Sequence, residues 1–293
     1  MDNFDNPLIL AVETSGRLGS VALAQGDKLL SETCFSGPMR HSAEIFPAIT
    51  GLLNKFDKKP DQIEQVYISA GPGSFTGLRI AVTFAKTLAL ANGAKIVAVD
   101  TLDVIAANVS PQLYVGGSNP SSVIETSPLG GQDEPGGFQY NEQLADCRAG
   151  LAPPILPAER LAVILDAKRG QFFIAVYDKT SHDLSRRSVA KTESRVTSDV
   201  SWHKILPDSL MTAEDFLAQF SDKPISLTGE GLVFYKDKFA HKNIRILDEK
   251  FWNPSAANIY KLGWQLALQN QFADPLTLTP NYIRGPDAIV KQR

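Results

Sequence analysis

The chain has 293 residues, of which 43% are hydrophobic and 21% are charged, and its formal net charge is −3 at pH 7. These values are ordinary for a globular protein and exclude a largely disordered chain or a strongly basic nucleic-acid binder. Any RNA would therefore have to be held mainly by a partner protein. The sequence begins without a leader-peptide pattern and has no long apolar segment, so we expect a cytoplasmic protein that does not bind membranes.

The first part of the chain predicts three strands followed by a helix. Residues 8–14, 20–24 and 28–35 are apolar or alternating and are separated by short turns, which is typical of a meander. Residues 41–56 carry Ile45, Ile49 and Leu52 at helical spacing, with Ser42 as the expected N-cap.

A glycine-rich loop follows the next predicted strand, 66–70. Residues 71–79 read Gly-Pro-Gly-Ser-Phe-Thr-Gly-Leu-Arg, and a helix is predicted from Ser74, its expected N-cap, to Asn92. Gly71 and Gly73 permit unusual backbone angles, and backbone amides at a helix start suit an anion such as a phosphate. A tight turn packed under the sheet explains the same loop equally well.

The predicted helix 74–92 is apolar on nearly all sides. Small residues recur every fourth position at Gly77, Ala81, Ala85 and Ala89, and the polar stripe is confined to positions 79, 83 and 86. Such a helix is either central in its own core or half of an interface.

The rest of the chain alternates predicted elements with one irregular stretch. We expect a strand at 95–99, a helix at 101–109 capped by Thr101, a hairpin at 161–177, a helix at 211–220, a strand at 224–228 and a helix at 254–269. Residues 111–157 are rich in proline and glycine and predict a flexible insertion at a domain boundary. Residues 280–284 are expected to be an extended tail that docks back on the fold.

Known catalytic and metal-binding patterns are missing from the sequence. The four histidines, at 41, 182, 203 and 241, form no pair at metal-ligand spacing, and Cys34 and Cys147 predict neither a disulfide scaffold nor a zinc cluster. The glycine loop lacks the Gly-Lys-Ser/Thr ending of a P-loop, and no Gly-x-Ser-x-Gly elbow occurs. We therefore expect no catalytic residue and no metal site.

Several motifs together resemble the TsaB family, also called YeaZ. They are the glycine loop 71–79, Ile-Leu-Ala-Val-Glu-Thr-Ser at 9–15, Ser-Val-Ala-Leu at 20–23, Arg-His-Ser at 40–42, Asp-Ala-Lys-Arg-Gly-Gln at 166–171 and Pro-Asn-Tyr-Ile-Arg at 280–284. The resemblance implies an α/β fold of two ribonuclease H-like (actin-like ATPase) domains, the second degenerate. With the composition, it places the domains at 1–110 and 158–293, on either side of the insertion.

The resemblance also implies a function. It indicates a noncatalytic dimerisation subunit in the synthesis of N6-threonylcarbamoyladenosine (t6A) in tRNA, which pairs with the catalytic protein TsaD and works with the ATPase TsaE. Alone, the chain would form a homodimer, and it would meet tRNA only through the complex. No cofactor is intrinsic, although ATP or ADP could lie at the interface with the partner.

The resemblance and the residue patterns give two sets of candidate site residues. The nucleotide or anion loop comprises Thr14, Ser15, Gly16, Gly71, Gly73, Ser74, Thr76 and Gly77. The partner interface comprises His41, Ile45, Ile49, Leu52, Phe75, Leu78, Arg79, Val82, Ala85, Lys86 and Ala89.

Two other functions remain open from the sequence. One is an independent ATPase or kinase of the actin-like superfamily, although Glu13 stands where many relatives have Asp. The other is a metalloprotease, which the missing ligand pairs disfavour.

Overall fold

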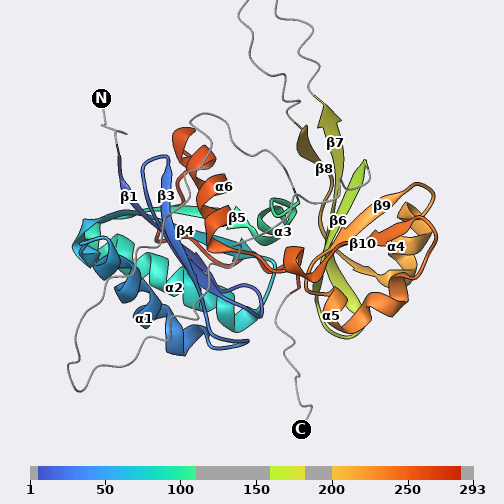
Figure 1. Ribbon diagram of the computed structural model, residues 1–293, viewed down its shortest axis with the longest axis horizontal. Helices are drawn as coiled ribbons and strands as arrows, with labels where there is room; N and C mark the ends of the chain where they lie inside the picture. Colours follow the sequence, from blue (N-terminus) through green and yellow to red (C-terminus); the bar gives the residue numbers. More distant parts are fainter. Residues whose placement is uncertain (1–5, 110–158, 182–199, 285–293) are drawn as a thin grey trace, which may run out of the picture.

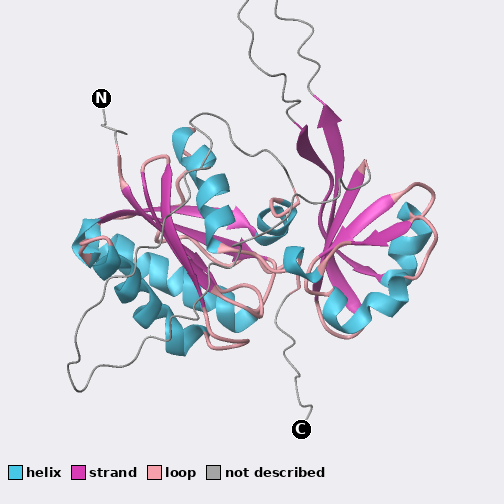
Figure 2. Ribbon diagram, viewed as in Figure 1, coloured by secondary structure: helices cyan, strands magenta, loops and turns pink. Residues whose placement is uncertain are grey.

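The computed structural model describes residues 6–109, 159–181 and 200–284. The predicted insertion at 111–157 lies outside these residues. Two five-stranded mixed sheets stand side by side, each with helices packed against it (Figures 1 and 2). In the described part of the chain no helix is both long and apolar enough to cross a membrane.

The first sheet has the strand order β3-β2-β1-β4-β5. The predicted meander is confirmed, since β1 (Leu8–Glu13), β2 (Ser20–Gln25) and β3 (Lys28–Cys34) pair antiparallel. On the other side of β1, the strands β4 (Ile63–Gly71) and β5 (Lys95–Asp100) run parallel to it.

Both faces of the first sheet are buried because helices cover each of them (Figure 1). Leu8, Leu10 and Val12 of β1 pack with α1 (His41–Lys55) and α2 (Phe75–Asn92). The alternate residues Ile9 and Ala11 pack with α6 (Ala256–Leu268) on the opposite face. The period of two along a strand therefore divides this core into two layers.

The second sheet repeats the order of the first, with strands β8-β7-β6 antiparallel and β6-β9-β10 parallel. Its strands are β6 (Arg160–Asp166), β7 (Gln171–Ser181), β8 (Val200–Thr212), β9 (Ile225–Thr228) and β10 (Ile244–Ile246). The helices α4 (Ala213–Phe220) and α5 (Leu232–Tyr235) pack on one face. Three short 3-10 helices complete the described elements, at Pro60–Gln62, Lys236–Phe239 and Glu249–Phe251.

Two helices connect the halves of the chain. α3 (Thr101–Ala106) lies between the sheets, with Leu102 and Ile105 in the core of the second sheet and Val104 in the core of the first. α6 comes from the end of the chain but packs on the first sheet. The predicted division at residues 110 and 158 stays a prediction, and these helices show that packing crosses it.

Several local predictions were wrong. α1 is preceded by Arg40 without a side-chain cap, so Ser42 is not its N-cap, and α3 follows Asp100 rather than starting after Thr101 and ends at Ala106. The helix predicted at 211–220 begins at Ala213, because residues up to Thr212 pair with β7 in the unpredicted strand β8. Cys34 is disulfide-bonded, which the cysteine count did not predict.

Candidate functional site

The glycine loop closes on the first hairpin. As predicted, Ser74 caps α2, its Oγ accepting from the Gly77 amide at 3.3 Å. The Ser74 amide itself donates to the Ser15 carbonyl at 2.8 Å, and the Leu78 amide donates to the Ser74 carbonyl at 2.9 Å. The amides of Ser74 and Gly77, which an anion at the helix start could otherwise bind, therefore already have acceptors within the chain.

Gly77 shows why this loop needs a glycine. A Cβ at this position would lie 1.7 Å from the Thr14 carbonyl oxygen, and the Thr14 hydroxyl donates to the Gly77 carbonyl at 2.7 Å. The start of α2 thus crosses the end of β1 in direct backbone contact. Packing alone accounts for this glycine, in agreement with the second of the two explanations left open by the sequence.

The predicted anion-loop residues mostly come together, with one exception. Thr14, Ser15, Gly16, Gly71, Gly73, Ser74 and Gly77 lie where the hairpin loop meets the start of α2. Thr76 is exposed and lines a groove between α1 and α2 instead. Whether a nucleotide binds to the assembled loop remains a prediction.

Glu13 lies at the end of β1 beneath these loops and is fully buried. Its Oε1 accepts from the Ser15 hydroxyl at 2.6 Å and from the Gly16 amide at 3.3 Å, and its Oε2 accepts from the Ser69 hydroxyl. Burial raises the pKa of Glu13, and the hydrogen bonds from Ser15, Ser69 and Gly16 oppose that rise. Oε1 thus holds the hairpin loop, and Oε2 is bonded to β4.

A second acidic residue reaches this place from the other sheet. Glu230 follows β9 in the turn 229–231, and its Oε2 accepts from the Arg17 amide at 2.9 Å. Burial is the main cause that raises the pKa of Glu230 to about 7, and the nearby charge of Glu13 adds to it. Glu230 was not among the predicted site residues. The feature that points to Glu230 is the repeated strand order. In the second sheet β9 takes the place that β4 takes in the first, so the turn after β9 corresponds to the glycine loop after β4.

His41 connects α1 to the same hairpin loop. Its Nε2 lies 3.0 Å from the Gly16 carbonyl oxygen, and since a carbonyl only accepts, Nε2 carries the proton. Burial lowers the pKa of His41, and the bond to Gly16 opposes this in part. The described residues contain no group of three or more His, Cys, Asp or Glu side chains that could hold a metal ion.

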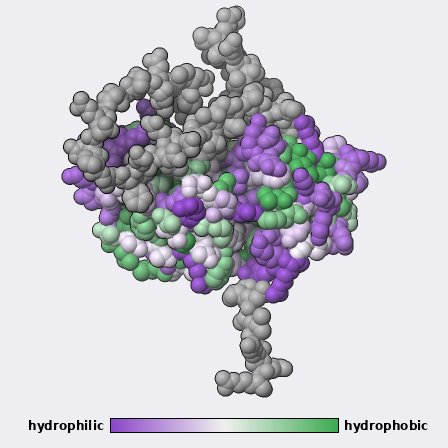
Figure 3. Space-filling view, turned by 60° about the horizontal axis from the view of Figure 1, so that its bottom comes forward, coloured by the Kyte–Doolittle hydropathy of each residue, from purple (hydrophilic) through white to green (hydrophobic). Residues whose placement is uncertain are grey.

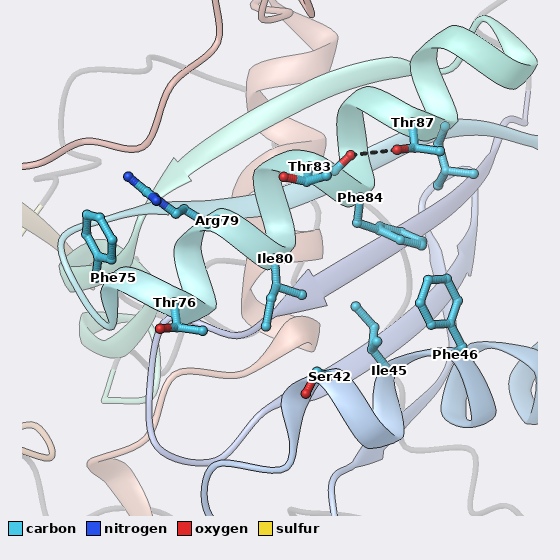
Figure 4. Close-up of a pocket in the computed structure, with 11 residues that line it drawn as sticks. Ser42, Ile45, Phe46, Phe75, Thr76, Arg79, Ile80, Thr83, Phe84 and Thr87 are labelled. Atoms are coloured by element: carbon cyan, nitrogen blue, oxygen red, sulfur yellow. Dashed lines mark hydrogen bonds between the residues drawn. The ribbon is translucent and has the colours of Figure 1, made fainter.

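A groove of about 670 Å³ lies between α1 and α2. It is lined by Ser42, Ile45, Phe46, Phe75, Thr76, Arg79, Ile80, Thr83, Phe84, Thr87 and Leu88. Phe46 and Phe84 face each other across it with ring centroids 6.0 Å apart, and Phe75 and Arg79 lie toward one end (Figure 4). Hydrophobic side chains are visible on both halves of the surface when the lower side of Figure 1 is turned forward (Figure 3).

The groove residues differ from most of those predicted for the partner interface. His41, Ile45, Ile49, Leu52, Leu78, Val82 and Ala85 are buried in the chain's own core. Phe75 and Arg79 are exposed, and Lys86 and Ala89 are half-buried. The small-residue side of α2 therefore faces the first sheet. The accessible residues Phe46, Ile80, Thr83, Phe84 and Leu88 of the outer side were missing from the predicted interface.

Comparison with known proteins gives consistent matches. The family described as TsaD, tRNA N6-adenosine threonylcarbamoyltransferase, matches residues 38–127, which include α1, the glycine loop and α2. Two structures from Pseudomonas aeruginosa share the fold: an uncharacterized protein with similarity to peptidase YEAZ (TM-score 0.60, 18% identity, covering 95% of this chain and 100% of that one) and YeaZ itself (TM-score 0.58, 20% identity, covering 94% and 99%). Together with the two mixed sheets, these matches support the predicted α/β, actin-like fold. That each sheet is a separate ribonuclease H-like domain stays a prediction.

Curated relatives carry the same name. The tRNA threonylcarbamoyladenosine biosynthesis protein TsaB of Escherichia coli (strain K12) is 33% identical over 100 residues, which are 33% of this chain and 42% of that protein. TsaB of Bacillus subtilis (strain 168) is 40% identical over 288 residues, which are 97% of this chain and 96% of that protein. With this identity over almost the whole of both proteins, the chain belongs to the TsaB family.

Proposed function

We propose that this chain is a noncatalytic subunit in t6A synthesis and that it binds a TsaD-like catalytic protein through the groove between α1 and α2. The observation that carries the proposal is the groove itself, in which aromatic side chains remain open to solvent. Phe46 is 64% exposed and Phe75 is 43% exposed, although both lie in an otherwise well-packed half of the molecule. Exposed apolar side chains gathered in a concave site are typical of a protein interface.

The closed loops support the noncatalytic part of the proposal. The amide of Ser74 and the carboxylate of Glu13 are engaged in contacts within the chain, at the place where a superfamily ATPase would bind phosphates. We expect no intrinsic cofactor, and ATP or ADP only at the interface with the partner. In the same proposal a TsaE-like ATPase joins the pair, tRNA is met only through the complex, the isolated chain forms a homodimer, and the location is cytoplasmic.

The test is a reconstituted transfer reaction with tRNA, the TsaD-like and TsaE-like proteins of the same organism, and the threonylcarbamoyl donor. We expect t6A to form only when this chain is added, and no transfer or ATP turnover by the chain alone. ATP turnover by the isolated chain, with transfer that does not depend on it, would instead support the independent ATPase or kinase.

A charge in the groove ties this activity to the proposed surface. Thr83 is exposed in the groove on α2, so Thr83→Glu should abolish complex formation while leaving the fold intact. Leu90→Glu places the same charge on the same helix outside the groove and serves as the control. Equal loss of transfer in both variants would contradict the assignment of the surface.

A further inference from the structure

The end of the described chain crosses from one sheet to the other as a strap, residues 280–284. At the first sheet, the Asn281 amide donates to the Ala70 carbonyl at 2.7 Å. At the second sheet, Arg284 donates to the Ala167 carbonyl at 2.6 Å and to the side chain of Gln171. Gly71 makes room for the strap, since its φ is +122° and a Cβ there would lie 2.6 Å from the Asn281 carbonyl oxygen. The predicted docking of this tail is therefore confirmed, and both of its ends are fixed.

Between these anchors the strap reaches one end of the groove. The Tyr282 ring lies 5.2 Å from the Phe75 ring between centroids, and its hydroxyl oxygen accepts from Arg79 Nε at 3.2 Å. The Arg79 guanidinium carbon lies 3.9 Å from the centre of the same Phe75 ring. Tyr282, Phe75 and Arg79 thus form one cluster, and two of its three members line the groove (Figure 4).

This arrangement leaves part of Arg79 available. Arg79 Nε donates to the Tyr282 hydroxyl, and the guanidinium stacks on the Phe75 ring. The two terminal nitrogens of Arg79 have no hydrogen bond to the described residues. Arg79 is exposed, so a partner can reach these donors. A carboxylate is the group that a fixed guanidinium recognises best, because two parallel N–H donors match its two oxygens.

We infer that Tyr282 is a positioning residue of the partner-binding surface, holding Phe75 and Arg79 so that the groove end receives an acidic side chain of the partner. The inference rests on the proposed function, because it takes the groove as the site of the TsaD-like protein. The physical basis is that an exposed Phe and an exposed Arg lose rotamer freedom when a partner covers them. Tyr282 removes that freedom in the free chain, so less is lost on binding.

The experiment compares the affinity of three variants for the TsaD-like protein by isothermal titration calorimetry. Tyr282→Ala removes the whole contact and should weaken binding by about tenfold. Tyr282→Phe keeps the ring on Phe75 and should stay within about threefold of the wild type, because only one exposed hydrogen bond is lost. Leu276→Ala changes another exposed residue of the same terminal segment and should bind like the wild type.

A double-mutant cycle tests whether Tyr282 acts through Arg79. Arg79→Gln alone should weaken binding and reduce its salt dependence, because an exposed charge pair is screened by salt. In the Tyr282→Ala background the same change should have a smaller effect, since Arg79 is no longer held in place. Additive effects, or wild-type affinity for Tyr282→Ala, would overturn the inference.

Two outcomes separate this inference from the proposed function. If Phe46→Ala weakens binding and Tyr282→Ala does not, the role of the strap is wrong while the groove assignment stands. If the wild-type chain does not bind the TsaD-like protein, the proposed function is wrong and the inference falls with it. Thermal unfolding of each variant shows whether a loss of affinity reflects a loss of fold.

Discussion

Replacing Phe46 by alanine is the most informative single change at the groove. The side chain is 64% exposed on α1, and its described ring contact is with Phe84 at 6.0 Å. An aromatic side chain buries about 200 Å² when it is fully covered, so a partner that covers the exposed part of Phe46 removes about 130 Å² from water. At about 25 cal/mol per Å² this area corresponds to about 3 kcal/mol, of which the alanine methyl group retains about 1 kcal/mol.

The remaining difference of about 2 kcal/mol predicts a dissociation constant about 30-fold higher for Phe46→Ala than for the wild type. The free energy of unfolding of the free chain should change by less than about 1 kcal/mol, because most of the side chain is already in water. Leu90→Ala is the control, since Leu90 is 77% exposed on α2 but does not line the groove. Calorimetric titration with the TsaD-like protein measures both variants. Affinity of Phe46→Ala within about twofold of the wild type, or an equal loss for Leu90→Ala, would refute the reasoning.

Three further changes test the packing inside the chain. The pKa of Glu230 is raised from 4.5 to about 7, so the folded chain binds this proton more tightly than the unfolded chain, and the free energy of unfolding should fall by up to about 3 kcal/mol between pH 4.5 and 7. In urea titrations Glu230→Gln should reduce this dependence on pH. An unchanged dependence would exclude Glu230 as its source. Gly77→Ala forces a Cβ against the Thr14 carbonyl and should lower the free energy of unfolding by more than about 3 kcal/mol or prevent folding. The control is Gly37→Ala, whose Cβ would have its nearest neighbouring atom at 3.9 Å and should leave the free energy of unfolding unchanged. Lys204 lies 2.8 Å from both Asp103 and Asp208, so Lys204→Met should cost about 1 kcal/mol by leaving two half-buried carboxylates without a counter-charge. A melting temperature equal to that of the wild type would show that the cluster contributes nothing.

The sequence predicted those elements whose local pattern agrees with their surroundings. The strands of the first meander alternate between two buried layers, and Ser74 supplies the cap that begins α2, so each was predictable from neighbouring residues. Strand β8 was not, because Pro207 interrupts its pattern and lies where the pairing with β7 shifts register. Only the long antiparallel partner makes this segment a strand.

The candidate site was predicted in part. The row of small residues on α2 could face either the sheet or a partner, and the sequence does not decide between them. In the structure Ala81 and Ala85 pack against the sheet, so the opposite side of α2 forms the groove. Phe46 was missed because it lies off the apolar spacing that identified the buried side of α1. Glu230 was missed because it is 213 positions from its partner Arg17, and only the arrangement of the two sheets brings them together.

The central claim is that this chain works by binding a TsaD-like protein, and size-exclusion chromatography with light scattering tests it most directly. The chain is measured alone, and then mixed with the TsaD-like protein of the same organism. We predict a complex with the mass of one copy of each, formed at the expense of a homodimer of this chain. Two separate peaks in the mixture, together with ATP turnover by this chain alone, would contradict the account.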